Sequence, residues 1–275
     1  MGKINEEALD NALAELDALG GLESAKSEVK LIADIGRVNA MREEHGLPTA
    51  QTARHMLFLG NPGTGKSTVA KIVGKVYAAL GVLSKGHVVE TDRGEMVVGY
   101  IGATPKKTKE IIERARGGIL YVDAASNLFG DMFGTEALNT LYVEIADNNS
   151  DIAVIFADYE QPLLDALSTN PALGARIRKH IQFSDLTPDE LYGYFGSIMK
   201  KYGCVATEDA DKAIKEYFAK MYEQRDARCF GNAREANRLF EQIFRRQINK
   251  LTKENRLSKE AMSEITLDLV PEFKK

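Results

Sequence analysis

Residues 56–67 read MLFLGNPGTGKS, and this stretch decides the fold. The apolar run 56–60 has the composition of a strand that is buried on both faces, and it stops at a glycine-rich loop. Residues 60–67 fit the pattern G-x-x-x-x-G-K-[ST], whose backbone N–H groups surround phosphate oxygens. Residues 67–80 then have helical periodicity, and the positive end of a helix favours the same phosphates. The stretch therefore predicts a nucleoside triphosphate site between a parallel strand and a helix.

Apolar runs and helical patterns alternate on both sides of this stretch. We expect further strands at 87–90, 119–123, 152–158 and 180–183, with helices at 105–116 and 135–147 between them. This alternation predicts an α/β fold, a parallel sheet flanked by helices on both faces. Two more helices, 4–19 and 23–44, are expected before the first strand.

The pattern changes at Thr187-Pro188-Asp189-Glu190, which reads as a capping box with proline in the first helical turn. We expect helices at 188–202, 208–224, 232–252 and 258–264, and the only strand-like pattern is 265–270. The sequence thus predicts an N-terminal helix (1–20), an α/β nucleotide-binding domain (21–185) and a small all-α lid domain (186–275).

Composition narrows the functional class. The chain has 275 residues, a formal net charge of -4 and 44% hydrophobic residues, which is ordinary for a globular protein. The slight acidity argues against nucleic acid as a partner, and without an apolar run of about 18 residues we expect no membrane span and a cytoplasmic location. Cys204 and Cys229 are expected to be reduced thiols, as is usual in a cytosolic protein. Neither the cysteines nor the scattered histidines have the spacing of metal ligands.

The candidate nucleotide site begins with the glycine loop. Lys66 is expected to reach the β- and γ-phosphates and Ser67 to coordinate Mg²⁺, so ATP with Mg²⁺ is the expected ligand. Asp123, which ends the apolar run 119–123, is the candidate second ligand of the metal; the alternative is an ordinary helix cap. The candidate nucleotide-binding residues in these two segments are Gly60, Asn61, Pro62, Gly63, Thr64, Gly65, Lys66, Ser67, Thr68 and Asp123, and Arg234 is a further candidate on the grounds given below.

Four segments together resemble the AAA+ ATPases of the CbbX type, a group that includes red-type Rubisco activases and relatives of stage V sporulation protein K. They are 55–93, 99–123, the N-linker-like 21-GLESAKSEV-29, and 231-GNAREANRLFE-241, which is similar to the sensor 2 helix. The resemblance covers the chain from about Leu19 onward. It implies a ring, usually a hexamer, that couples ATP hydrolysis to the remodelling of a client protein, with ATP sites between subunits.

The resemblance also implies roles for single residues. Tyr100, Ile101 and Gly102 match the aromatic–aliphatic–glycine loop of the family's central pore, although Tyr100 alone reads as an ordinary loop aromatic. Arg234 matches sensor 2, which closes the lid onto the γ-phosphate, and Arg176 matches the arginine finger that reaches a neighbour's γ-phosphate. Either arginine is otherwise a surface residue.

The chain departs from the family where hydrolysis is catalysed. The family's Asp-Glu-Ala-Tyr is here Asp123-Ala124-Ala125-Ser126, so the glutamate that polarises the attacking water is missing at Ala124. Loss of a positioned general base typically slows a reaction by about 10²–10⁴-fold. Gly174 stands where the family has a further arginine. Asp158 stands where the family has glycine. Its carboxylate could partly replace the missing glutamate, but the negative charge of ATP would repel it, which disfavours that role.

Three functions are compatible with these features. The first is an ATP-binding subunit of a homo- or hetero-oligomeric ring, with weakened or absent hydrolysis. Ala124 is then either a natural or an engineered residue, and the other departures favour a natural one. The second is an active CbbX-like remodelling motor in which another group supplies the base. The third is a small-molecule kinase, which the pore-loop and sensor 2 motifs disfavour. The client protein is not readable from the sequence.

Overall fold

The computed structural model describes residues 4–49, 54–100, 102–147, 149–254 and 258–273. They form two compact units. The first unit contains the chain up to Gly60 together with Gly65–Phe183, and the second contains Asn61–Thr64 together with the chain from Ser184 onward. The tip of the glycine loop is therefore grouped with the C-terminal unit.

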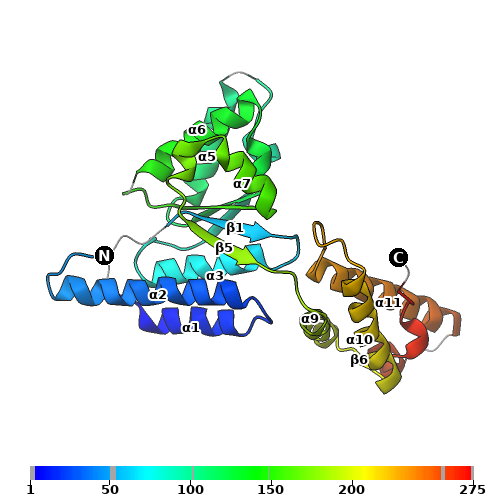
Figure 1. Ribbon diagram of the computed structural model, residues 1–275. Coiled ribbons are helices and arrows are strands. Elements are labelled where there is room, and N and C mark those ends of the chain that lie inside the picture. The colour runs from blue at the N-terminus through cyan, green and yellow to red at the C-terminus, as the bar shows by residue number, and fades with distance from the viewer. Residues whose placement is uncertain (1–3, 50–53, 101, 148, 255–257, 274–275) are drawn as a thin grey trace. The chain divides into compact units, whose positions relative to one another are not determined.

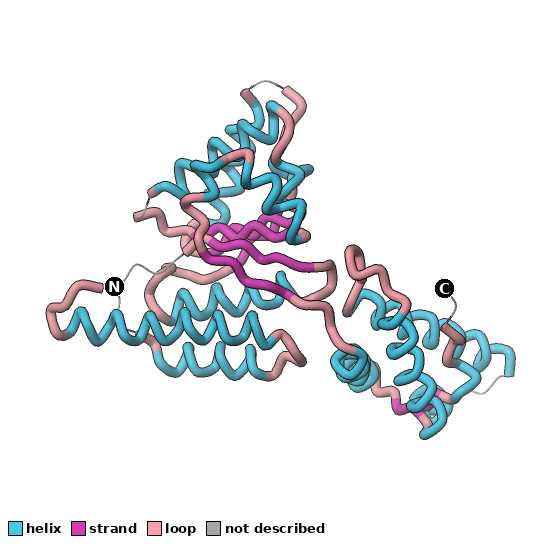
Figure 2. The backbone as a smooth tube through the Cα atoms, in the orientation of Figure 1, coloured by secondary structure: helices cyan, strands magenta, loops and turns pink. Residues whose placement is uncertain are grey.

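A five-stranded parallel sheet forms the centre of the first unit (Figure 2). Its strands are β1 (Met56–Gly60), β2 (Val88–Thr91), β3 (Ile119–Asp123), β4 (Ala153–Asp158) and β5 (Lys179–Phe183), in the order β2-β3-β4-β1-β5. The expected α/β class and the parallel sheet are confirmed. In such a sheet the carboxyl ends of all strands meet at one edge, where ligands bind.

Helices cover both faces of this sheet, which explains the unbroken apolar runs (Figure 1). Phe58 faces the core beneath α1 (Glu6–Asp17), α2 (Glu23–Glu44) and α3 (Lys66–Ala79), whereas its neighbour Leu57 belongs to the opposite core. That second core is covered by α5 (Ala103–Ala115), α6 (Met132–Ala146) and α7 (Glu160–Ser168), with the short helices α4 (Arg93–Met96) and α8 (Pro171–Gly174) nearby in the chain.

The N-terminal helix α1 is part of the first unit. Its apolar residues Leu9, Ala12 and Leu16 are buried in the core beside α3. Arg37 on α2 pairs with Glu6 and Asp10 of α1 at 2.9 Å and 2.8 Å. The apolar face of α1 is therefore not available to a partner protein.

The second unit is mainly helical. It contains α9 (Pro188–Lys201), α10 (Glu208–Glu223), α11 (Ala233–Glu254) and α12 (Lys259–Ser263), with β6 (Val205–Ala206) paired in parallel to β7 (Glu264–Ile265). Phe195, Phe218 and Phe240 form its aromatic core. The expected capping box is confirmed, because Thr187 and Glu190 exchange hydrogen bonds at the start of α9.

Some boundaries differ from the sequence prediction. Residues 265–270 are mostly not a strand, since a 3₁₀ turn, Leu267–Leu269, follows β7. Helix α5 begins at Ala103 instead of Pro105, because Gly102 has a φ of 77° and starts the helix two residues earlier. No helix among the described residues has both the length and the apolar character needed to cross a bilayer.

Candidate nucleotide-binding site

The glycine loop 60–67 joins β1 to α3 at the carboxyl edge of the sheet, as predicted. Gly63 and Gly65 have φ values of 73° and 94°, which only glycine adopts without strain. Gly65 is the N-cap of α3, and no side chain caps that helix. The N–H groups of the first turn of α3 therefore lack a side-chain acceptor, an arrangement that suits phosphate oxygens.

Two glycines are required by close contacts. A Cβ on Gly60 would lie 2.2 Å from the carbonyl oxygen of Phe183, the last residue of the neighbouring strand β5. A Cβ on Gly63 would lie 2.3 Å from the carbonyl oxygen of Gly231, which belongs to the same unit. Substitution at either position forces backbone atoms apart, so both glycines are needed to form the loop.

Lys66 is buried within the loop, and its Nζ donates a hydrogen bond to the carbonyl oxygen of Gly60 at 2.7 Å. The ammonium group therefore lies inside the glycine loop, where the phosphates are expected to bind. Ser67 is half-buried and Thr68 is exposed, both in the first turn of α3. A hydroxyl and an ammonium group at a helix N-terminus match the chemistry of a phosphate-bound Mg²⁺.

Asp123 is the last residue of β3 and is exposed. The register aligns Asp123 with Ala157 of β4, and Asp158 with Leu59 of β1, so these residues lie at the edge where the glycine loop begins. Among the described residues the Asp123 carboxylate has no hydrogen bond or ion pair within the protein. A carboxylate and a serine hydroxyl are hard oxygen ligands, the kind that Mg²⁺ prefers, so the donor set fits the metal that the motif implies.

The residue after Asp123 adopts an unusual backbone conformation. Ala124 has φ 47° and ψ 46°, in the left-handed region. This conformation costs a non-glycine residue about 1–2 kcal/mol. It turns the chain from β3 into the 3₁₀ helix η1 (Ala125–Leu128), where the N–H of Asn127 donates to the carbonyl oxygen of Ala124 at 3.0 Å. No carboxylate is present at position 124, where the resembled family has its glutamate.

Asp158 and Ser126, two residues that differ from the pattern of the resembled family, are hydrogen-bonded to each other. Asp158, at the end of β4, is buried, and its Oδ2 accepts hydrogen bonds from the N–H of Ser126 at 2.9 Å and from its Oγ at 2.6 Å. The Oδ1 of Asp158 accepts from the N–H of Tyr159 at 2.7 Å. With three donors on its two oxygens, Asp158 is engaged in holding the chain, which disfavours it as a replacement base.

The two candidate arginines are both exposed. Arg176 follows α8, and Arg234 is the second residue of α11 in the second unit. In the part of the chain that the structure describes, neither forms an ion pair with a carboxylate. A Cβ on Gly174 would have the carbonyl oxygen of Leu167 as its nearest neighbour, at 3.8 Å. The space therefore admits a side chain at position 174, and no steric contact requires glycine there.

The candidate pore loop is open to solvent at its described positions. Tyr100 is 76% exposed, and a Cβ on Gly99 or Gly102 would meet nothing within 4 Å. Ile101 lies outside the described residues. An exposed tyrosine between two unhindered glycines has the freedom to contact an extended polypeptide.

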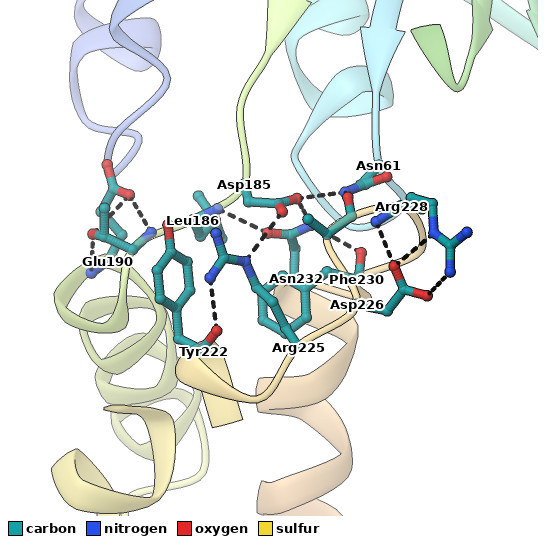
Figure 3. A network of polar contacts seen from close by, with 12 residues as sticks. Asn61, Asp185, Leu186, Glu190, Tyr222, Arg225, Asp226, Arg228, Phe230 and Asn232 are labelled. Carbon is teal, nitrogen blue, oxygen red and sulfur yellow. Dashed lines mark hydrogen bonds and ion pairs between the residues drawn. The ribbon is translucent and has the colours of Figure 1, made fainter. Parts of the chain in front are cut away.

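A polar network in the second unit was not anticipated from the sequence (Figure 3). Its centre is Asn232, which is fully buried and has φ 51°. Its Oδ1 accepts from the N–H of Leu186 at 2.8 Å, and its Nδ2 donates to Asp185 at 2.9 Å and to the carbonyl oxygens of Phe230 and Pro62 at 3.0 and 3.2 Å. Asn232 thus fixes the loop tip and the start of the C-terminal segment together.

Asn61 and Arg225 complete this network. The Nδ2 of Asn61 donates to Asp185 and to the carbonyl oxygen of Ala227, both at 2.8 Å. Nε of Arg225 lies 3.6 Å from the Asp185 carboxylate, and its guanidinium group lies 3.4 Å from the ring centre of Tyr222. The side chain of Asn61 therefore contacts protein atoms, so a contribution to nucleotide binding would come from its backbone.

Three further titratable groups, His55, Cys204 and Cys229, lie elsewhere in the described part of the chain. Burial lowers the pKa of His55 to about 4, and its Nδ1 accepts the N–H of Val154 at 3.1 Å. Cys204 and Cys229 are free thiols, and burial raises the pKa of Cys204. Over the described ranges, no group of three or more His, Cys, Asp or Glu side chains is arranged to hold a metal ion.

Comparison with known proteins agrees with this architecture. Residues 56–185 match the ATPase family associated with various cellular activities (AAA), and residues 187–274 match the AAA lid domain. The chain is 35% identical to stage V sporulation protein K of Bacillus subtilis (strain 168) over 240 residues, covering 86% of this chain and 74% of that protein.

A second relative is the chloroplastic ribulose bisphosphate carboxylase/oxygenase activase of Cyanidioschyzon merolae (strain NIES-3377 / 10D). The two chains are 32% identical over 250 residues, which cover 90% of this chain and 83% of the relative. A protein named CbbX is also similar, so the expected relationship to that group is confirmed.

Solved structures show the same fold. The FIGL-1 AAA domain in complex with ADP superposes with a TM-score of 0.65 at 15% identity, covering 92% of this chain and 80% of that one. At this identity the likeness concerns the fold alone. The strand order, the glycine loop, the lid and the two matched relatives together show that the chain belongs to the AAA+ ATPase family.

Proposed function

We propose that this chain is an ATP-binding subunit of an AAA+ ring within a protein-remodelling complex, and that its hydrolysis is weakened or absent. One observation carries the proposal. The glycine loop, Lys66, Ser67 and Asp123 are all in place at the carboxyl edge of the sheet, whereas the next residue is Ala124, which cannot orient a water molecule. Side chains suited to binding ATP and Mg²⁺ are present, whereas position 124 has no carboxylate that could act as the general base.

Each residue of the loop has a defined task in this proposal. The N–H groups at the start of α3 and the ammonium group of Lys66 would hold the phosphates. Ser67 and Asp123 would hold Mg²⁺, which neutralises phosphate charge when bound. Arg234 of the second unit would contact the γ-phosphate. None of these tasks needs the carboxylate that is missing at position 124.

Membership of a ring is supported by the family and by two exposed groups. AAA+ proteins usually assemble into oligomeric rings, and we propose a hexamer here. Arg176 is exposed and has no carboxylate partner among the described residues, so it is free to enter a neighbour's site as an arginine finger. Tyr100 is available to contact a client in the pore. The name of the Cyanidioschyzon merolae relative makes ribulose bisphosphate carboxylase/oxygenase a first client to test.

The alternative is an active remodelling motor, as the relatives' family favours. It requires another group to supply the base. Asp158, at the end of the neighbouring strand β4, is a candidate, but three hydrogen bonds already engage its oxygens. The geometry therefore supports the subunit with weakened hydrolysis over the motor.

The test measures ATP binding and ATP hydrolysis side by side. The proteins are the wild type, Lys66→Ala, Ala124→Glu and a control, Lys71→Ala. Lys71 is on the same helix but is exposed and paired with Glu90 at 2.8 Å, so its loss removes a charge without touching the loop. We expect the wild type and Lys71→Ala to bind ATP equally and Lys66→Ala to lose binding.

Turnover separates the two functions. We expect Ala124→Glu to hydrolyse ATP about 10²–10⁴ times faster than the wild type, the range for a restored general base. Wild-type turnover at ordinary AAA+ rates that Lys66→Ala abolishes would support the active motor instead. A protein that stays monomeric in saturating ATP, measured by light scattering, would exclude the ring.

A further inference from the structure

The contact between Ser126 and Asp158 suggests how the metal ligand is oriented. We propose that Asp158 is a positioning residue: by holding Ser126 it fixes the turn 123–126 and so directs the Asp123 carboxylate toward the Mg²⁺ of bound nucleotide. This inference rests on the proposed ATP-binding function and names a further residue of the same site. Asp158 itself touches neither the nucleotide nor the metal in this proposal.

Asp123 has little else to orient it. It is the last residue of β3, it is exposed, and among the described residues its carboxylate forms no hydrogen bond or ion pair within the protein. The sheet fixes its backbone only on the strand side, through the pairing with Ala157. The direction of its side chain therefore depends on the residues that follow, beginning with Ala124.

Those following residues need an external anchor. Ala124 is in the left-handed region, which an alanine leaves readily unless its surroundings hold it. The anchor is Oδ2 of Asp158, which accepts both the N–H of Ser126 at 2.9 Å and its hydroxyl at 2.6 Å. Asp158 is only 6% exposed, so water competes little for these hydrogen bonds.

Asp158 is itself well fixed. It ends β4, the strand between β1 and β3, and its Oδ1 accepts the N–H of Tyr159. The same strand is therefore paired with the strand that carries the glycine loop and with the strand that carries Asp123. Asp158 therefore connects the rigid sheet to Ser126 at the start of η1, and through Ser126 to the turn that follows Asp123.

The chain provides a matched control at the other end of β4. Oδ1 of Asp151 accepts the N–H of Ser84 at 3.1 Å, and its Oδ2 accepts the Ser84 hydroxyl at 2.6 Å. This pair has the same chemistry as Ser126 with Asp158, but it lies at the amino end of the strand, away from the glycine loop. Loss of either pair removes similar hydrogen bonds, and only one pair is connected to Asp123.

The experiment measures the dissociation constant of ATPγS in excess Mg²⁺ and in excess EDTA for the full-length chain. The ratio of the two constants is the gain in affinity that the metal provides. We expect Asp158→Asn and Ser126→Ala each to lower this gain by about tenfold, the range for residues that orient metal ligands, with the affinity in EDTA unchanged. Ser84→Ala and Asp151→Asn should keep the wild-type gain.

Thermal unfolding of all four variants identifies any that fail to fold, and Ser126→Ala, which keeps the backbone N–H donor, is the mildest. A gain within twofold of wild type in both Ser126→Ala and folded Asp158→Asn would overturn the inference while leaving ATP binding established. A wild type that binds ATPγS equally with and without Mg²⁺ would also overturn it. A wild type that binds no ATPγS would reject the proposed function, and the inference with it.

Discussion

The side-chain amide of Asn61 donates a hydrogen bond to the carboxylate of Asp185 at 2.8 Å, although the two residues are 124 positions apart in the chain. Asp185 also accepts from Asn232, so a single carboxylate joins the tip of the glycine loop to the residue that precedes α11. Residues outside the glycine motif, Asp185 and Asn232, thus help to hold the loop in its conformation.

Substitution of Asn232 should be strongly destabilising. Asn232→Ala removes the acceptor of the Leu186 N–H and three donated hydrogen bonds, and it leaves an alanine at φ 51°. We expect a loss of about 3 kcal/mol in the free energy of unfolding, because buried groups lose their partners. Urea denaturation measures it.

Asn232→Gly separates the effect of the lost hydrogen bonds from the effect of backbone strain, because glycine adopts a positive φ without strain. It should be about 1 kcal/mol less destabilising than Asn232→Ala. Asn237→Ala serves as the control, because Asn237 lies in α11 five residues further on and its side chain is only half-buried; this change should cost less than about 1 kcal/mol. Equal effects of alanine at positions 232 and 237 would contradict the central role of Asn232.

Position 124 offers a stabilising substitution. Ala124→Gly relieves the left-handed strain, and we expect the free energy of unfolding to rise by about 0.5 kcal/mol, since glycine also costs chain entropy. Ala125→Gly is the adjacent control: Ala125 is buried in η1 and has no positive φ, so that change should destabilise the protein. Thermal unfolding of both variants decides whether the strain is present in solution.

The half-buried His55 gives stability a pH dependence. Burial lowers the pKa of His55 from 6.5 to about 4, so the unfolded chain binds a proton more readily than the folded chain. Stability is therefore lost as the pH falls from about 6.5 toward 4. At pH 5 this amounts to about 2 kcal/mol relative to pH 8.

His55→Asn should remove that dependence, whereas substitution of the exposed His45 should not. The measurement is the difference in unfolding free energy between pH 8 and pH 5 for the wild type, His55→Asn and His45→Asn. Because other groups titrate as well, the comparison between variants isolates His55. Identical pH differences in all three proteins would show that His55 is not buried in its neutral form.

Restoring an arginine at position 174 should be harmless to the fold. A Cβ at Gly174 would be 3.8 Å from its nearest neighbour, and the residue is in the short helix α8. We expect Gly174→Arg to change the free energy of unfolding by less than about 0.5 kcal/mol. Gly60→Ala, which brings a Cβ to 2.2 Å from the Phe183 oxygen, is the contrasting variant and should destabilise severely.

Much of the fold could be predicted because its signals are local. The glycine motif determines where β1 ends and α3 begins, and unbroken apolar runs mark β3 and β4. Helix α2 also has the predicted bounds, Glu23–Glu44. The sequence patterns do not predict α4 and α8, each four residues long, because one helical turn contains no repeated spacing to detect. Helix α7 is also not among the predicted helices, although it has nine residues.

The supports of the site could not be predicted in the same way. Asp158 and Ser126 both depart from a family pattern, but nothing in their sequence spacing of 32 residues shows that they share a hydrogen bond. Asn232 precedes a helix like many asparagines that cap or turn the chain, and its partners Asp185 and Pro62 are far away in sequence. Such contacts depend on packing between distant segments.

The grouping of Asn61–Thr64 with the C-terminal unit limits how this protein can be divided. A chimera that exchanges residues 184–275 for those of a relative would separate Asn61 and Pro62 from the Asp185, Ala227 and Asn232 atoms they contact. A functional exchange would need to transfer four residues of the phosphate loop together with the lid. Loop and lid are therefore expected to change together in evolution, as one inherited module interrupted by 119 residues of sheet and helix.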